Sequence, residues 1–474
     1  MTRPFRSEDF LWLSIALLPL IGLSFLFAIQ PQDYWWLLRV GQDTIQNGTI
    51  PVTDTISLSQ YGNPIVYQPW LAGVLYWLVY DMGGISFIFL LRGALIALTY
   101  GSIWLMLREV SNIQLATALL IVLGLAGANN WSVRSQLFAY PLFIFCLWSL
   151  TRWQSGNNKY LWMLPPSTFL WANLHGSFAL PLILAGAALL FGEGERKPLL
   201  ITFGSMIVAT LLNPRGFGAW GYFVFMLNSP SDQFFAFEWA PPRNEGWQNN
   251  LFFAWLLVFA PLGAFSPRKL SRLEWVWFLG FGWLALSGLR YVVWFLFVIS
   301  VPTAALLAGW MKHTDEPRQK FPGINMAFGI FILSLSLLFL PGLRQRWMGD
   351  TVPIYEMTTT PLAATEWLAG RPELRGPLWT DYAFGGYLSF NLQSHQPWMD
   401  SRFNAFPAEQ WTEYVQVSRA ENWQEVFDRE KINLLMLSTA SQPDLVEAVS
   451  ASMLWCEEYR DRYAFIFSRC EPLR

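Results

Sequence analysis

The stretch "FLWLSIALLPLIGLSFLFAIQPQDYWW", residues 10–36, decides the fold class, because no charged residue interrupts it before Asp33. Its apolar part, residues 10–29, is long enough to cross the hydrocarbon core of a bilayer as a helix. Arg3 and Arg6 precede this run, and no small-residue cleavage site follows it. This pattern indicates a signal anchor that stays in the protein and not a signal peptide that is removed.

The composition of the whole chain agrees with a membrane protein. Hydrophobic residues make up 54% of the sequence, aromatic residues 17% and charged residues only 14%, which is far from the average soluble domain. The net charge of −2 and the absence of a long basic run argue against nucleic acid as a partner. We therefore expect an integral membrane protein whose partners include the lipid bilayer.

Apolar runs of suitable length recur along the first 343 residues and predict a polytopic α-helical protein of about 11 transmembrane helices. The expected spans are residues 10–29, 84–107, 112–128, 135–151, 160–173, 175–192, 198–212, 250–266, 272–288, 291–310 and 323–342. Residues 1–343 thus form a multi-span membrane domain with a large first outer loop at 30–83. Residues 344–474 have ordinary charge density and predict a separate α/β domain outside the membrane.

The basic residues predict the sidedness of the spans. With the N-terminus in the cytoplasm and eleven crossings, every alternate loop is basic, as the positive-inside rule requires. The cytoplasmic basic residues are then Arg3, Arg6, Arg108, Arg152, Lys159, Arg196, Lys197, Arg268, Lys269, Arg272, Lys312, Arg318 and Lys320. We expect a multi-pass protein of the bacterial inner (plasma) membrane with an extracytoplasmic C-terminal domain. Cys456 and Cys470 form a disulfide bond there or remain free thiols.

Polar residues gather in the segments that this topology places outside. Asp33 directly follows the first span, and an acidic residue at the bilayer boundary is costly unless it lines a water-filled cleft or has a partner. A loop carboxylate among interfacial tryptophans is the equally favoured alternative. The other polar residues at outer span ends or in outer loops are Asp54, Arg134, Asn173, His175, Asn213, Arg215, Glu238 and Arg290.

These residue types are those needed to move a group off a phosphate at a membrane surface. Carboxylates act as general bases or bind a divalent cation, and arginines hold phosphate through paired donors. Structural alternatives stay open for each residue. Arg134 and Arg290 are also expected as snorkelling anchors at span ends. His175 is also expected as a hydrogen-bonded turn residue, and Asp54 and Glu238 as loop carboxylates.

Several segments together resemble the GT-C superfamily of membrane glycosyltransferases, including its mannosyltransferase-like and aminoarabinose-transferase-like members. The segments are residues 33–84, "VRSQLFAYPLF" (133–143), "LWANLHGSFAL" (170–180), "LLNPRGFGAW" (211–220), "FEWAPP" (237–242), "WTDYAFGGYLSF" (379–390) and "WMDSRF" (398–403). The resemblance covers nearly the whole chain. It implies that an acidic residue close behind the first span is the catalytic base or a metal ligand, and Asp33 occupies that place.

The family often carries adjacent acidic residues at this position, whereas Tyr34 and Trp35 follow Asp33 here. A second acid would then come from Asp54 or Glu238. The cofactor is unknown, with a divalent metal as a candidate. In the C-terminal domain, "TDYAFGGYLSF" and "PWMDSRF" predict two strand-and-turn units, and Asp381, Asp400 and Arg402 are either structural ion-pair partners or ligands.

The resemblance implies a glycosyltransferase that moves a sugar from a polyprenyl-phosphate donor to a glycan, lipid or protein acceptor on the outer face, with inversion expected. Asp33 would deprotonate or orient the acceptor, and Arg134 and Arg290 would neutralise the departing lipid phosphate. Asn173, His175, Trp36 and Trp70 are further candidates for substrate binding. The alternative is a non-catalytic membrane component or a transporter of lipid-linked saccharides in envelope glycan assembly.

Overall fold

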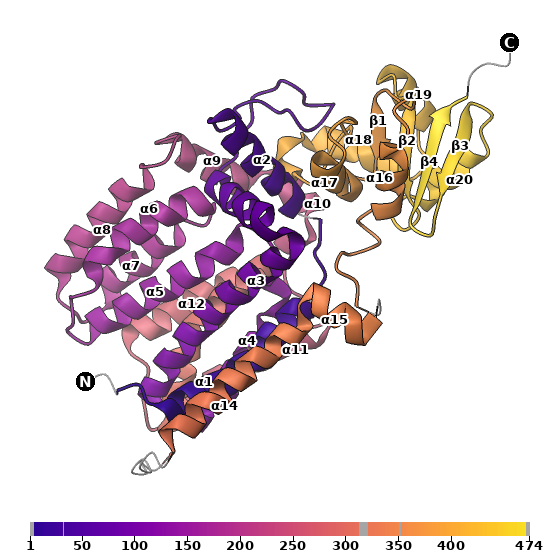
Figure 1. The fold of residues 1–474 in the computed structure, drawn as a ribbon. Helices are drawn as coiled ribbons and strands as arrows, with labels where there is room; N and C mark the ends of the chain where they lie inside the picture. Colours follow the sequence, from indigo (N-terminus) through magenta and orange to yellow (C-terminus); the bar gives the residue numbers. More distant parts are fainter. Residues whose placement is uncertain (1–3, 32, 312–320, 350–351, 471–474) are drawn as a thin grey trace.

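The computed structural model describes residues 4–31, 33–311, 321–349 and 352–470. Its helices from α1 to α15 form an elongated bundle, and a smaller domain built around a four-stranded sheet lies at one end of it (Figure 1). Of the basic residues used to predict sidedness, Arg3, Lys312, Arg318 and Lys320 lie outside the described residues. The expected domain boundary between residues 343 and 344 falls within α15 (Pro341–Met348).

Each of the predicted spans coincides with a helix. These helices are α1 (Ser7–Leu26), α3 (Trp70–Val110), α4 (Ile113–Ala126), α5 (Gln136–Gln154), α6 (Leu164–Leu174), α7 (Leu180–Phe191), α8 (Arg196–Thr210), α11 (Trp247–Phe265), α12 (Arg272–Ser287), α13 (Val292–Ala308) and α14 (Pro322–Leu335). Among the described residues, five segments are long and apolar enough to cross a membrane: Ser7–Leu26, Trp70–Val110, Trp247–Phe265, Leu289–Ala308 and Pro322–Phe339. The fold is that of a membrane protein, and the number of eleven crossings stays a prediction.

Shorter elements connect these helices. They are α2 (Tyr34–Asn47), α9 (Gly218–Asn228), α10 (Pro230–Phe235), and the 3₁₀ turns η1 (Ala128–Asn130), η2 (Leu161–Met163), η3 (Phe237–Trp239), η4 (Leu289–Tyr291) and η5 (Ser336–Phe339). The first outer loop, expected at 30–83, therefore contains α2 and the first part of α3. Gly83 and Gly84 have non-helical backbone angles, with φ of +60° at Gly84, so α3 kinks where the sequence predicted its start.

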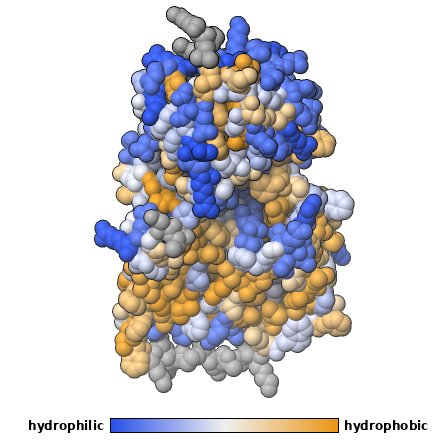
Figure 2. Space-filling model, turned by 90° about the vertical axis from the view of Figure 1, so that its right-hand side faces the viewer, coloured by the Kyte–Doolittle hydropathy of each residue, from blue (hydrophilic) through white to orange (hydrophobic). Residues whose placement is uncertain are grey.

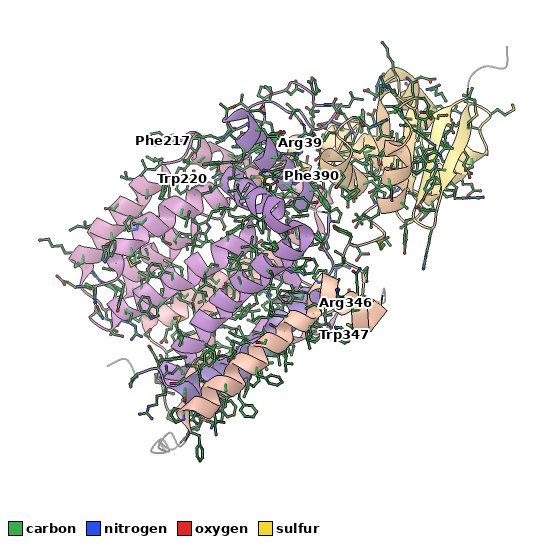
Figure 3. All side chains as sticks on the ribbon, in the orientation of Figure 1. Arg39, Phe217, Trp220, Arg346, Trp347 and Phe390 are labelled. Carbon is green, nitrogen blue, oxygen red and sulfur yellow. A yellow bond between two sulfur atoms is a disulfide. The ribbon has the colours of Figure 1, made fainter. Side chains whose placement is uncertain are left out.

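Two glycines fix α2 against the first part of α3. A Cβ atom built on Gly41 would lie 2.1 Å from the carbonyl oxygen of Gly73, so the two helix backbones meet without an intervening side chain. At its other side α2 contacts the C-terminal domain, where Nη1 of Arg39 donates to the carbonyl of Ser389 at 3.1 Å. Figure 3 shows Arg39 and the neighbouring Phe390 side by side at this junction. Asp33, which precedes α2, is thereby held between the bundle and the C-terminal domain.

The surface separates into an apolar and a polar part. Figure 2 shows hydrophobic residues over the lower part of the molecule and hydrophilic residues over the C-terminal domain at the top. Large apolar side chains such as Leu190, Phe265 and Trp283 are exposed on the bundle, as expected where lipid replaces water. Phe217 and Trp347 are also exposed, at the end of the bundle that faces the C-terminal domain (Figure 3). That position fits aromatic anchors at the membrane interface.

The C-terminal domain has a mixed sheet with the strand order β1-β2-β4-β3. β1 and β2 are parallel, while β4 is antiparallel to both β2 and β3. The elements are α16 (Leu362–Ala369), β1 (Leu378–Thr380), α17 (Tyr382–Asn391), η7 (Phe403–Ala405), α18 (Ala408–Ser418), α19 (Trp423–Arg429), β2 (Leu434–Ser438), α20 (Pro443–Ser450), β3 (Trp455–Arg460) and β4 (Ala464–Arg469). The expectation of an α/β domain agrees with these elements.

Neither of the two strand-and-turn units predicted for this domain forms the expected strand, and "PWMDSRF" contributes only an isolated bridge between Pro397 and Leu378 before η7 begins. The run "GGYLSF" was expected as a strand, but it belongs to α17. Asp381 starts this helix by accepting hydrogen bonds from the backbone amides of Ala383 and Phe384. Gly385 then lets the helix approach residue 399 closely, since a Cβ there would lie 2.2 Å from the carbonyl oxygen of Met399. The capping carboxylate and this close packing outweigh the strand propensity of the aromatic residues.

Cys456 and Cys470 form a disulfide bond that joins β3 to the end of β4. Replacing both with serine is expected to lower the free energy of unfolding of the C-terminal domain by about 3 kcal/mol, because the bond closes a short loop in the unfolded chain. Thermal unfolding of the full chain in detergent, with and without reductant, measures this. Reductant should lower the unfolding temperature of the wild type to that of the variant and leave the unfolding temperature of the variant unchanged. A wild-type transition that ignores complete reduction would contradict the expectation.

Candidate functional site

A cavity of about 520 Å³, here called the central cavity, lies where the bundle meets the C-terminal domain. The first outer loop, the start of α5, the turn after α6, α10, η3, η4 and residues 401–404 all contribute to its wall. The predicted site residues that line it are Asp33, Trp36, Arg134, His175, Glu238 and Arg290. Residues far apart in the sequence are thus brought together at the end of the bundle that faces the C-terminal domain.

Arg134 is the centre of the ionic contacts in this cavity. Its Nε atom lies 3.0 Å from Oδ2 of Asp33, and its Nη2 atom donates to Oε1 of Glu238 at 2.9 Å. Nη1 of Arg134 contacts the other oxygen of Glu238. The hydroxyl of Tyr76 on α3 donates to the backbone carbonyl of Arg134 at 2.8 Å and so fixes the chain just before α5. The planar guanidinium therefore holds two carboxylates at once, one of them through both oxygens.

Arg290 approaches the same carboxylate from η4. Its Nη1 atom is 3.4 Å from Oε1 of Glu238, and its guanidinium lies over the ring of Trp239 at 4.4 Å from the ring centre. Burial alone would raise the pKa of Glu238, but Arg134 and Arg290 outweigh it and lower that pKa to about 2. Glu238 is therefore an anion that compensates the two arginines and not a proton donor near neutral pH.

His175 lies in the turn between α6 and α7. Its Nδ1 atom accepts a hydrogen bond from the backbone amide of Ser177 at 3.1 Å and is 2.7 Å from the hydroxyl of Ser177. Burial, helped by the positive charges of Arg290 and Arg134, lowers the pKa of His175 to about 3. An imidazole that accepts at Nδ1 carries its proton on Nε2, so His175 is a neutral hydrogen-bond donor.

Trp36 is the aromatic residue of α2 in the wall of the central cavity. Its ring centre is 6.1 Å from that of Tyr67, and its buried indole Nε1 has no hydrogen-bond partner among the described residues. A buried N–H group without a partner is costly.

Asn173 and Trp70, also expected as substrate-binding residues, lie outside the central cavity. The indole Nε1 of Trp70 donates to the side-chain oxygen of Asn173 at 3.1 Å. The amide nitrogen of Asn173 donates to the carbonyls of Phe169 and Leu212. Trp70 borders a separate, smaller cavity of about 120 Å³. Their polar groups connect α3, α6 and α8 and are used within the protein.

Asp54, one of the two candidates for a second acid, is used in another ion pair. It is buried, accepts hydrogen bonds from the backbone of Ile56 and Ser57, and binds Arg402 at 2.9 Å. Arg402 also binds Asp400, at 2.6 Å, and its Nη1 atom donates to the hydroxyl of Tyr67. Arg402 and Asp400 are thus structural ion-pair partners, which was one of the two readings left open. Asp54 holds the first outer loop on the C-terminal domain.

The described residues contain no group of three or more His, Cys, Asp or Glu side chains placed to hold a metal ion. Asp33 and Glu238, two predicted site acids in the wall of the central cavity, are both held by the guanidinium of Arg134. As arranged, they do not fit a divalent cation, which prefers free carboxylate oxygens. We therefore derive no step of the reaction through a metal.

One residue of the cavity was not singled out from the sequence. Asp232 on α10 lines the central cavity, is 6% exposed, and has an Oδ2 atom with no hydrogen-bond partner among the described residues. Its sequence context, "NSPSDQFF", is typical of a helix start, because Ser229 caps α10 and Pro230 opens it. Asp232 was therefore not predicted as a site residue, since an acidic residue in the first turn of a helix is common without any function.

Comparison with known proteins identifies the fold. No protein-family model matches the sequence, and neither does any curated protein sequence. Among solved structures, the Archaeoglobus fulgidus oligosaccharyltransferase tethered to an acceptor peptide is similar, with a TM-score of 0.57 and 11% identity over 97% of this chain and 74% of that chain. The mycobacterial arabinofuranosyltransferase AftD has a TM-score of 0.51 and 14% identity over 97% of this chain and 40% of AftD.

ArnT from Cupriavidus metallidurans in the apo state is also similar, with a TM-score of 0.50 and 13% identity over 97% of each chain. All three neighbours are GT-C superfamily glycosyltransferases. The chain has the GT-C fold. In the GT-C neighbour AglB from Archaeoglobus fulgidus, one structure contains an inhibitory peptide and a dolichol-phosphate. The GT-C fold expected from the sequence is confirmed, and at these identities the likeness concerns the fold alone.

Proposed function

We propose that the chain is a glycosyltransferase that moves a sugar from a polyprenyl-phosphate donor to an acceptor hydroxyl or amine on the outer face of the bacterial inner membrane. The observation that carries the proposal is the central cavity. The side chains of Arg134, Arg290, Asp33, Glu238 and the neutral His175 meet in it, at the polar end of an apolar bundle. The GT-C fold supports the same reaction class, and the dolichol-phosphate in AglB supports the donor class.

The shape of the cavity supports a lipid-linked donor. One flank is apolar and includes Leu180, Ile183, Leu227, Phe237 and Leu284. Ile183, Leu227, Phe237 and Leu284 lie on elements next to the membrane-facing surface, and the first three are exposed. An isoprenoid chain can lie on this flank and remain in the bilayer while its phosphate reaches the arginines.

The arginines supply charge for the departing phosphate. Arg290 makes a looser contact with Glu238, at 3.4 Å, than Arg134, whose Nη2 bond is 2.9 Å. Arg290 therefore moves onto a phosphate oxygen at lower cost, while Arg134 keeps the carboxylates in place. The neutral His175 adds a hydrogen bond to the same phosphate without adding charge. Such donors stabilise the charge that develops on the leaving group.

Asp33 orients the acceptor in this proposal. Its Oδ2 atom is held by Arg134, so its carboxylate is fixed in position and its other oxygen accepts a hydrogen bond from the acceptor hydroxyl or amine. A direct displacement of the lipid phosphate by the acceptor inverts the anomeric carbon and requires no nucleophile from the protein. The disulfide of the C-terminal domain supports the outer location, because such bonds persist in oxidising compartments.

The test of this function compares cells that lack the chain with cells in which it is restored. We expect the loss of one envelope glycan and the accumulation of its lipid-linked sugar precursor, because the final transfer is missing. A membrane-impermeant periodate reagent, applied to whole spheroplasts, then reports on which leaflet the precursor lies. Precursor on the outer leaflet supports a transferase. Precursor confined to the inner leaflet supports the transporter alternative, and an unchanged glycan and lipid profile contradicts both.

A further inference from the structure

Asp232 and Glu356 line the central cavity without an ion pair among the described residues, but Glu356 is only half-buried and accepts a hydrogen bond from Thr358, whereas Asp232 is buried. Arg134 holds Asp33 and Glu238, whereas Oδ2 of Asp232 has no hydrogen-bond partner among the described residues and the side chain is 6% exposed. A buried carboxylate oxygen without a donor costs free energy. Because Asp232 lines the central cavity, its carboxylate lies where a donor group of a bound molecule would approach it.

Contacts between α10 and the C-terminal domain hold Asp232 in this buried position. The hydroxyl of Ser231 donates to the carbonyl of Phe406 at 2.9 Å, and the ring of Phe235 stacks on Trp411 at 5.7 Å between ring centres. Both contacts fix α10 on the C-terminal domain. Asp232 thus has little freedom to turn its carboxylate towards water, and such pre-organised polar groups are typical of sites that act on a ligand.

The charged and titratable groups around Asp232 come from several elements. They are Tyr222 on α9, Glu238 in η3, Arg290 and Tyr291 in η4, and Asp33 before α2. Burial raises the pKa of Asp232 to about 6, although Ser229 and Arg290 oppose the shift. The carboxylate is consequently ionised at neutral pH and still basic enough to take up a proton.

We propose that Asp232 accepts the proton of the acceptor hydroxyl or amine, a role that rests on the proposed glycosyltransferase function. The acceptor atom forms a bond to the anomeric carbon, and its proton passes to the carboxylate of Asp232. The bond between the anomeric carbon and the phosphate oxygen breaks, and its electron pair leaves with the lipid phosphate. Asp33 and Asp232 then have different roles, because the ion-paired acid orients the acceptor and the unpaired acid receives the proton.

The test uses the full chain in membranes and, as donor, the polyprenyl-phosphate sugar extracted from cells that lack the chain. We expect the wild-type rate to rise with pH and to level off above a midpoint near 6, because the ionised form of Asp232 is the active form. Asp232→Asn is expected to lower turnover about 100-fold and to abolish this rise, with KM for the donor unchanged. Asp232→Glu restores part of the rate and a pH midpoint.

Asp444→Asn, at an exposed position of α20, is the control and retains the wild-type dependence of the rate on pH.

Infrared difference spectroscopy tests the same residue without a substrate. A carbonyl band from a protonated carboxyl group should titrate near pH 6 in the wild type and be absent in Asp232→Asn. Turnover of Asp232→Asn within about twofold of wild type, or an unchanged pH profile, overturns the role of Asp232 even when the wild type is active. A wild type that transfers no sugar overturns the proposed function itself, so the two failures are distinguishable.

Discussion

Asp33→Asn is expected to lower sugar transfer at least about 100-fold at an unchanged amount of protein in the membrane. Asparagine has nearly the shape of aspartate but no charge, so the ion pair with Arg134, now 3.0 Å long, is lost. The asparagine amide also has only one oxygen, so its NH2 group can face the acceptor where the proposed mechanism needs a carboxylate oxygen. The fold should survive, because Arg134 keeps Glu238 as a partner. Transfer from the extracted polyprenyl-phosphate sugar, normalised to the protein detected in the membrane, measures the effect.

Asp43→Asn is the matched control for this substitution. Asp43 lies on the same helix, α2, and also pairs with an arginine, Arg39, at 2.9 Å. It does not line the central cavity. We therefore expect Asp43→Asn to retain transfer within about twofold, since the pair lies outside the central cavity and pairs of residues i and i+4 on a helix contribute little. Full transfer by Asp33→Asn would remove Asp33 from the mechanism. An equal loss in both variants would show that the effect comes from α2 as a whole and not from the cavity.

Arg402→Met is expected to destabilise the protein by about 3–5 kcal/mol, the largest effect on stability that we expect from a single substitution. The guanidinium is buried between Asp54 and Asp400 and also binds the hydroxyl of Tyr67. Methionine fills a similar volume but leaves two buried carboxylates without a cation. The first outer loop should then separate from the C-terminal domain. Thermal unfolding in detergent measures the loss, and limited proteolysis should show new cleavage in the first outer loop.

Arg429→Met provides the comparison for an arginine with two acidic partners at the surface. Arg429 contacts Glu413 and Glu430, but its side chain is 49% exposed. We expect a change in stability below about 1 kcal/mol there. If the two arginine variants unfold at the same temperature as the wild type, the buried ion pairs do not hold the first outer loop, and the packing of α2 on α3 must suffice.

The helices of the bundle could be predicted from the sequence because each has enough apolar residues in one run. The short elements could not. The helix α2, for example, carries the polar residues Arg39, Gln42 and Asp43 on the side that contacts the C-terminal domain and was expected as part of a loop. Its contact with α3 depends on two glycines 32 positions apart, Gly41 and Gly73, and no local pattern in the sequence marks such a pair.

The candidate site could be predicted in part. The predicted topology placed Asp33, Arg134, Glu238 and Arg290 on one side of the membrane, and the structure has them in the wall of one cavity. Sidedness does not predict which partner each side chain finds. Asp54 shares that side but binds Arg402, 348 residues further along the chain, because pairing depends on where the C-terminal domain docks. The sequence before residue 344 does not indicate where the C-terminal domain docks.

Contacts between the first outer loop and the C-terminal domain also impose an order on biogenesis. Asp54 and Arg402 are separated by 348 residues, and the backbone amides of Leu58 and Ser59 donate to the carbonyls of Pro397 and Trp398. At about 5–20 residues per second, translation leaves the loop without these partners for on the order of 20–70 s. A ribosome that terminates between residues 349 and 401 releases a chain with its predicted spans made but the central cavity unfinished, because residues 401–404 of its wall are missing.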